Sequence, residues 1–108
     1  MMSAEPLPVD PFAALGDPNR RAIVESLAGG DRSVQEIADG LTISRPAVSR
    51  HLRLLREAGL VVDHAEGTKR LYRLDDHGVE VLVRYMEEIW GDVANRFRLA
   101  AENTRDSP

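Results

Sequence analysis

The basic side chains of this sequence gather in one segment, and their chemistry is the binding of anions. Residues 44–73 carry seven basic and three acidic side chains, a net charge of +4, whereas the rest of the chain carries −8. Arginine donates parallel hydrogen bonds to phosphates and to guanine edges, so this segment favours DNA or RNA as a partner despite the overall charge of −4. A solvated arginine-rich helix face without any partner is the alternative interpretation.

Signs of catalytic or metal-binding chemistry are weak by comparison. The chain has no cysteine, which excludes disulfides, thiolate metal sites and a cysteine nucleophile. We find no Ser/His/acid set, glycine-rich phosphate loop or metal triad, and therefore expect neither an enzyme nor a cofactor. Asp75, Asp76 and His77 are more typical of a helix cap than of a metal site, and His64 has no partner at ligand spacing.

The length of 108 residues predicts a single domain. No apolar stretch approaches the roughly 18 to 20 residues that span a bilayer, and the N-terminus lacks the features of a signal peptide. We therefore expect a cytoplasmic protein without a membrane partner. The expected organisation is a flexible arm over residues 1–9, one domain over residues 10–102 and a frayed end over residues 103–108.

Helix-start signals position the elements before the basic segment. Asp10 and Asp17 each precede a proline, which combines a capping side chain with a residue tolerated in the first turn. The first of these helices ends at Gly16 and the second at Gly29-Gly30.

Two further helices follow with only a tight connection between them. Ser33 and Glu36 form a capping box that opens a helix over residues 33–40, and Ser44 caps a helix over residues 44–58. The spacing of Val48, Leu52 and Leu55 predicts the buried side of this second helix. Its arginines therefore face outward.

A change of periodicity after Gly59 predicts a β-hairpin. Residues 61–65 and 70–74 are β-prone and flank residues 66–69, where Gly67 supplies a positive φ. Asp75 or Asp76 then caps a last helix of about 24 residues, ~36 Å long. Two short helices, a hairpin wing and a long helix predict a mainly α winged helix-turn-helix.

The last helix is too apolar to be covered by one small domain. An exposed apolar patch of this size favours a homodimer, whereas packing of the helix over its own core is the alternative. The residues expected at the dimer interface are Phe12, Leu15, Met86, Ile89, Trp90, Val93 and Phe97.

The predicted fold places a helix of the right width to enter the major groove of DNA, with the hairpin tip beside it. The residues expected to contact DNA are Ser44, Arg45, Pro46, Ser49, Arg50, Arg53, Thr68, Lys69 and Arg70. His51 lies on the flank of the buried stripe, which is compatible with a structural hydrogen bond or with a DNA contact.

Three separated motifs resemble the ArsR/SmtB type of bacterial transcriptional regulators. They are ALGDPNRRAIV at residues 14–24, SRPAVSRHLRLLREAGLV at residues 44–61 and RLYRL at residues 70–74. The resemblance implies a homodimer that binds operator DNA, often as an autorepressor released by an effector. Residues Arg45, Pro46, Ser49 and Arg50 match the DNA-facing start of the family's recognition helix, and Lys69 with Arg70 matches its wing.

Many members of that family sense metals, but their ligand patterns are incomplete in this sequence. The helix at residues 33–40 lacks the family's Cys-x-Cys pair. Asp75 and His77 match half of a second pattern, whose other half falls on Glu88 and Gly91, and glycine cannot coordinate. We therefore expect no metal, and the effector remains unknown from the sequence.

The sequence predicts a DNA-binding transcriptional regulator that binds a short inverted repeat as a homodimer, and more specifically an autoregulating repressor. A twofold dimer would present its two recognition helices about 34 Å apart, one turn of DNA. The alternative is a winged-helix module that docks a protein partner with little specific DNA binding, which the net acidic charge and the apolar last helix would suit.

Overall fold

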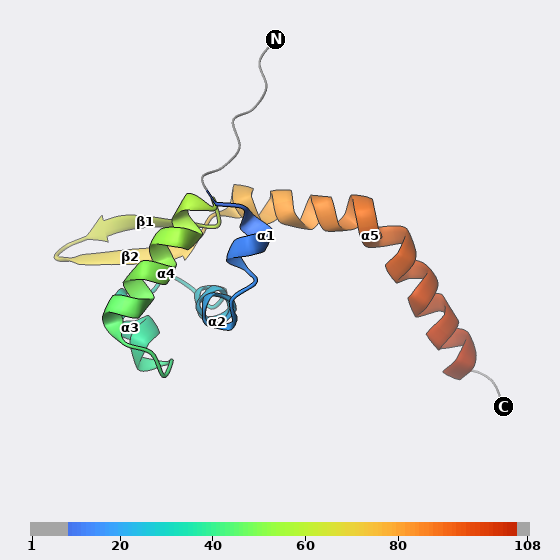
Figure 1. Cartoon of the computed structure of the whole chain (residues 1–108), viewed down its shortest axis with the longest axis horizontal. Helices are drawn as coiled ribbons and strands as arrows, with labels where there is room; N and C mark the ends of the chain where they lie inside the picture. Colours follow the sequence, from blue (N-terminus) through green and yellow to red (C-terminus); the bar gives the residue numbers. More distant parts are fainter. Residues whose placement is uncertain (1–8, 106–108) are drawn as a thin grey trace, which may run out of the picture.

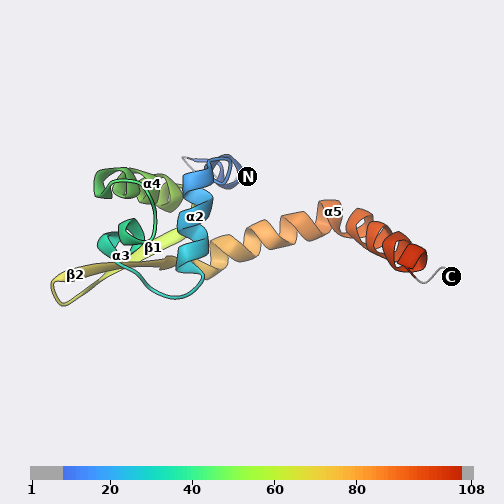
Figure 2. The same cartoon turned by 90° about the horizontal axis from the view of Figure 1, so that it is seen from below.

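The computed structural model describes residues 9–105, in which short helices and a hairpin form a body and a long helix leaves it (Figure 1). The elements are α1 (Pro11–Ala14), α2 (Pro18–Leu27), α3 (Val34–Asp39), α4 (Arg45–Glu57), β1 (Val61–Glu66), β2 (Lys69–Leu74) and α5 (Asp76–Arg105). The hairpin and α5 leave the helical body in opposite directions (Figures 1 and 2). The predicted fold class, mainly α with a hairpin wing, is confirmed.

The predicted helix starts are also confirmed. The carboxylates of Asp10 and Asp17 accept backbone N–H hydrogen bonds of 2.8–3.1 Å from the first turns of α1 and α2. The Ser33 hydroxyl accepts from the N–H of Glu36 at 3.2 Å, while the Glu36 carboxylate accepts from the N–H of Ser33 at 2.9 Å. Ser44 caps α4 in the same manner, at 3.3 Å from the N–H of Ala47. These bonds satisfy backbone donors that lack partners within the helices.

The core forms where α2, α3, α4 and the start of β1 meet. Val48, Leu52 and Leu55, the predicted inner stripe of α4, are each at most 1% exposed. They pack with Ile23 of α2 and Ile37 of α3. Burial of each large apolar side chain contributes roughly 1.5–3 kcal/mol, so this cluster fixes α4 against the helices beneath it.

The hairpin has a tighter turn than the sequence predicted. Its strands pair antiparallel from Val61 opposite Leu74 to Glu66 opposite Lys69, so only Gly67 and Thr68 form the loop instead of four residues. Gly67 has a φ of 64°, and Thr68 has no positive φ, which is the pattern of a type II′ turn. Because side chains alternate along a strand, each of the two faces of the hairpin collects every second residue.

A backbone bridge joins the hairpin to the linker before α3. The N–H of Arg32 donates to the carbonyl of Tyr72 at 3.0 Å, and the N–H of Tyr72 donates back at 2.8 Å. The Arg32 side chain also donates to the carbonyl of Ser26 at 2.9 Å. The hairpin is therefore held to the helical body by hydrogen bonds in the middle of β2, and not only by the chain connections at its two ends.

The end of α4 is closed by Gly59 and Leu60. Gly59 has a φ of 77°, and the N–H of Leu60 donates to the carbonyl of Leu55 at 3.0 Å. The N–H of Gly59 donates to the carbonyl of Arg56, which completes a Schellman motif. Leu60 is 2% exposed and turns the chain into β1.

The two ends of the described chain differ from the expected boundaries. Asp75 caps α5, because its carboxylate accepts from the N–H of His77 at 3.0 Å. The helix has 30 residues instead of about 24 and includes residues 103–105. Residues 1–8 and 106–108 lie outside the described residues, and Val9, expected in the arm, packs against the core. Within residues 9–105, no helix is both long and apolar enough to cross a membrane.

Candidate nucleic-acid interface

The outer face of α4 carries the side chains that the sequence assigned to DNA. Arg45, Pro46, Ser49, Arg50 and Arg53 are exposed, as is the cap Ser44. Because a helix repeats every 3.6 residues, the burial of the inner stripe turns this set toward solvent. The core thus holds one rigid helix whose free side is mostly basic and hydroxylic.

Three arginines on this face are not engaged within the protein. In the part of the chain that the structure describes, Arg45, Arg50 and Arg53 form no ion pair and no side-chain hydrogen bond. A guanidinium offers five N–H donors in a planar fork, which matches phosphates and the paired acceptors of guanine. Their binding capacity is therefore available to an external anion.

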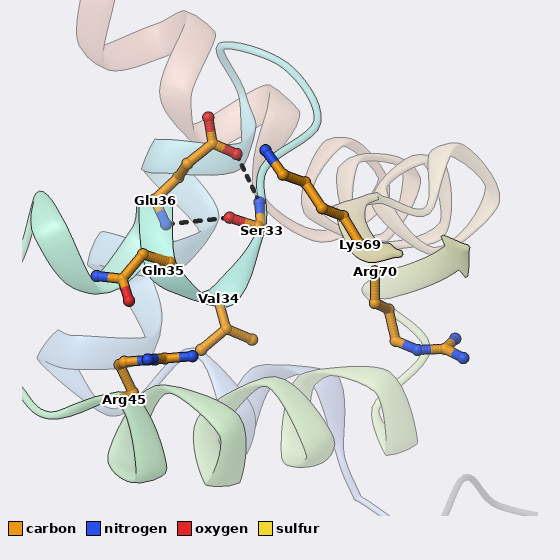
Figure 3. Close-up of a pocket in the computed structure, with 7 residues that line it drawn as sticks. All are labelled: Ser33, Val34, Gln35, Glu36, Arg45, Lys69 and Arg70. Atoms are coloured by element: carbon orange, nitrogen blue, oxygen red, sulfur yellow. Dashed lines mark hydrogen bonds between the residues drawn. The ribbon is translucent and has the colours of Figure 1, made fainter. Parts of the chain in front are cut away.

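The tip of the hairpin and the starts of α3 and α4 enclose a cleft of about 380 Å³ (Figure 3). Its lining residues are Ser33, Val34, Gln35, Glu36, Arg45, Lys69 and Arg70. Figure 3 shows Lys69 directed toward Ser33 and Glu36, whereas Arg70 points the other way. The backbone N–H of Ser33 lowers the pKa of the Glu36 carboxyl, with a smaller contribution from Lys69, so this acid stays ionised beside the basic residues. Thr68, also predicted to contact DNA, is exposed at the turn.

A second groove lies between α4 and β2. It has a volume of about 230 Å³ and is lined by Ser49, Arg50, Arg53, Arg56 and Tyr72. Neither Arg56 nor Tyr72 was among the predicted DNA contacts. The helical spacing of Arg53 and Arg56 was a signal for the arginine, but the position of Tyr72 depends on how the hairpin packs against α4. The groove joins the predicted helix contacts to the wing in one basic surface.

Among the basic residues predicted to contact DNA, Arg70 is the one with an ion-pair partner in the described part of the chain. Its Nη1 donates to Oδ2 of Asp63 at 2.6 Å, while Nη1 of Arg56 donates to Oδ1 at 3.2 Å. The Asp63 side chain is 10% exposed, against 51% for Arg56 and 57% for Arg70. The hydrogen bond from Arg70 lowers the pKa of the Asp63 carboxyl most strongly, so this group is ionised at neutral pH.

His51 has the structural role that was one of its two interpretations. Its Nδ1 lies 3.4 Å from Nη1 of Arg20, and the side chain is half-buried. Nε of Arg20 donates to the carbonyl of Ala14 at 2.7 Å. His51 thus forms part of the contact of α4 with α2 and the end of α1.

The expected dimer residues are distributed over two environments. Met86, Ile89, Trp90, Val93 and Phe97 lie along α5 and are 46–79% exposed. Phe12 is 43% exposed and its ring lies 5.0 Å from that of Tyr85, an aromatic residue missed by the sequence prediction. Leu15 is half-buried and packs against the chain's own core. Leu82 begins the apolar stripe of α5 on the core, and the stripe then continues into solvent.

Of the two remaining histidines, His64 lies near carboxylates. Nε2 of His64 is 3.8 Å from Oδ2 of Asp31 and 3.8 Å from Oε2 of Glu66. Asp75 acts as the cap of α5, as preferred over a ligand role. Among the residues from 9 to 105, no group of three His, Asp or Glu side chains is arranged to hold a metal ion.

Comparison with known proteins identifies the helix-turn-helix. Residues 17–62, from α2 into β1, match the model of the bacterial regulatory proteins of the arsR family. The HTH-type transcriptional regulator Rv2034 of Mycobacterium tuberculosis is 46% identical over 82% of this chain and 83% of its own length. The chain belongs to the arsR family. The resemblance noted in the sequence is therefore confirmed.

Other relatives support the same assignment. The transcriptional repressor SdpR of Bacillus subtilis is 36% identical over 69% of this chain and 83% of its own length. A crystal structure of a possible transcriptional regulator for arsenical resistance superimposes with a TM-score of 0.72 and 36% identity, covering 85% of this chain and 96% of the other. Proteins of the arsR family are transcriptional regulators and not enzymes, and they are typically dimers that bind operator DNA.

Proposed function

We propose that this chain is a transcriptional repressor that binds a short inverted-repeat operator as a homodimer and regulates its own promoter. In this proposal α4 of each protomer enters a major groove and the hairpin lies over the adjacent backbone. Such a protein acts where the chromosome is, in the cytoplasm. Residues 44–46, 49, 50 and 53 with residues 68 and 69 form the proposed DNA-binding surface, and α5 with Phe12 forms the proposed dimer interface.

The observation that carries the proposal is the set of unengaged arginines on α4. A buried inner stripe holds the helix rigidly, so Arg45, Arg50 and Arg53 present their donors without the cost of ordering the backbone. Arg50 is the proposed base reader, because it lies in the N-terminal half of the helix, which approaches base edges most closely. Lys69 is the proposed phosphate contact at the wing.

The dimer is supported by the unpartnered part of α5. The apolar stripe that begins on the core at Leu82 runs on through Met86, Ile89 and Val93 with no covering element in the described chain. A twofold partner would supply the same stripe and bury both. The relatives named as repressors motivate repression instead of activation.

A gel shift on DNA from the protein's own promoter, at 50 and 200 mM salt, tests the proposal. A repressor of this kind shifts that DNA in preference to a scrambled duplex and loses affinity steeply as salt rises, because binding displaces counterions from phosphates. The competing protein-docking module shows no specific shift. Equal affinity for the scrambled duplex at both salt concentrations would contradict the proposal.

A further inference from the structure

Asp63 is the one carboxylate that connects the two halves of the proposed DNA-binding surface within the described residues. It lies on β1, and its two oxygens accept from different arginines, Arg56 of α4 and Arg70 of β2. The carboxylate is largely covered while both arginines remain half-exposed. The three side chains therefore form a bridge from the recognition helix through β1 to the wing.

The register of the hairpin explains why this bridge forms. Asp63 lies opposite Tyr72 and is two residues along from Val61, so Asp63, Tyr72 and Val61 share a face. Val61 is 1% exposed and packs in the core beneath α4, which turns this face toward the helix. Arg70 stands diagonally across the strands from Asp63, within the reach of a long side chain.

We propose that Asp63 is a positioning residue that sets the wing against the recognition helix, and that Arg70 serves this bridge and not a direct DNA contact. This inference rests on the proposed function, because a fixed distance between α4 and the wing matters only if both meet one duplex. The sequence had assigned Arg70 to DNA together with Lys69. The two residues are adjacent in a strand and point to opposite sides (Figure 3).

The substitution Asp63→Asn distinguishes two roles of Asp63, because an electrostatic role and a positioning role predict opposite changes in operator affinity. If Asp63 only adds negative charge near the DNA, its neutralisation raises operator affinity. If Asp63 positions the wing, the same substitution lowers operator affinity by about fivefold or more, the size of one lost DNA contact. Glu66→Gln is the matched control, because Glu66 is on the same strand and has no arginine partner among the residues that the structure describes. We expect this control to bind at least as tightly as wild type.

Two further variants show whether a loss of operator affinity comes from breaking the Asp63–Arg70 bridge or from destabilising the whole fold. Asp63→Glu keeps the carboxylate and should recover most of the operator affinity. Arg70→Gln should add little to Asp63→Asn in the double variant, because both changes break the same bridge. If the losses of operator affinity in the two single variants added up in the double variant, Arg70 would contact DNA by itself, and that part of the inference would be overturned.

The experiment combines operator affinity with amide hydrogen exchange of the free protein over residues 63–72. We expect faster exchange in Asp63→Asn than in Glu66→Gln, restored in Asp63→Glu, together with the loss of affinity. Unchanged exchange, or a gain of affinity in Asp63→Asn, overturns the inference even if wild type binds its operator. Wild type could fail to bind any promoter DNA while the exchange rates change as expected. In that case the bridge does hold the wing to α4, but the proposed function is refuted.

Discussion

A Cβ atom at Gly78 would lie 1.8 Å from the carbonyl oxygen of Gly59, so α5 meets the end of the recognition helix at backbone contact. The N–H of Asp75 also donates to the carbonyl of Leu60 at 2.9 Å, just beyond the same turn. Only glycine fits this approach. The contact fixes the start of the proposed dimerisation helix relative to α4, and with it the distance between the two recognition helices of a dimer.

Substitution of Gly78 by alanine tests this contact. Because the nearest atoms belong to backbone, they must shift, and we expect the free energy of unfolding in urea to fall by about 1–3 kcal/mol. Gly91→Ala is the control, since a Cβ there meets nothing within 4 Å and alanine favours a helix. Equal stability of the two variants would contradict the account of the α4–α5 contact.

A charge in the apolar stripe of α5 tests the dimer. Val93→Glu would place a carboxylate in the proposed interface, where an uncompensated buried charge costs about 3–5 kcal/mol. We expect sedimentation velocity to show monomers at concentrations where wild type is dimeric, with operator binding weakened as well. Glu87→Gln, on the same helix, should sediment like wild type. A Val93→Glu variant that dimerises normally would place the interface elsewhere.

Removal of Arg50 tests base reading. Arg50→Ala should weaken operator binding by about 1–3 kcal/mol and reduce the preference for the operator over scrambled DNA. Arg98→Ala removes the same charge from the far half of α5 and should leave that preference intact. Fluorescence anisotropy with both duplexes measures the two affinities. If Arg50→Ala kept wild-type affinity and preference, α4 would not be the reading helix.

Removal of Lys69 tests the wing. Lys69→Ala should weaken binding to operator and scrambled DNA by similar factors, because a phosphate contact carries no base information. The slope of log affinity against log salt should decrease in magnitude by about 1. Titrations at four salt concentrations give this slope. A loss confined to one base position of the operator would instead assign Lys69 to base recognition.

Capping residues and helical periodicity predicted most of the helices. The contacts between elements depended on tertiary packing. Aspartate and serine caps marked the starts of α1 to α4, and the inner stripe of α4 followed from its helical period. The exposure of Arg50 could be predicted from that stripe. The pairing of Arg70 with its acidic partner could not be predicted, because it depends on the two-residue turn at Gly67 and on which hairpin face meets α4.

Contacts between distant segments left no pattern in the sequence. Nothing local distinguishes Gly78 from a glycine that merely weakens a helix, since its role comes from the carbonyl of Gly59 across the α4–α5 junction. The pairing of Arg20 with His51 likewise joins residues 31 positions apart. Such contacts can be recognised only once the positions of the helices and strands relative to one another are known.

Protection of DNA from dimethyl sulfate shows which groove α4 enters, because this reagent methylates guanine N7 in the major groove and adenine N3 in the minor groove. We expect two clusters of protected guanines about one helical turn apart in the protein's own upstream DNA, both lost with Arg50→Ala. A single cluster, or protection of minor-groove adenines alone, would contradict the claim that a symmetric pair of chains inserts α4 into successive major grooves.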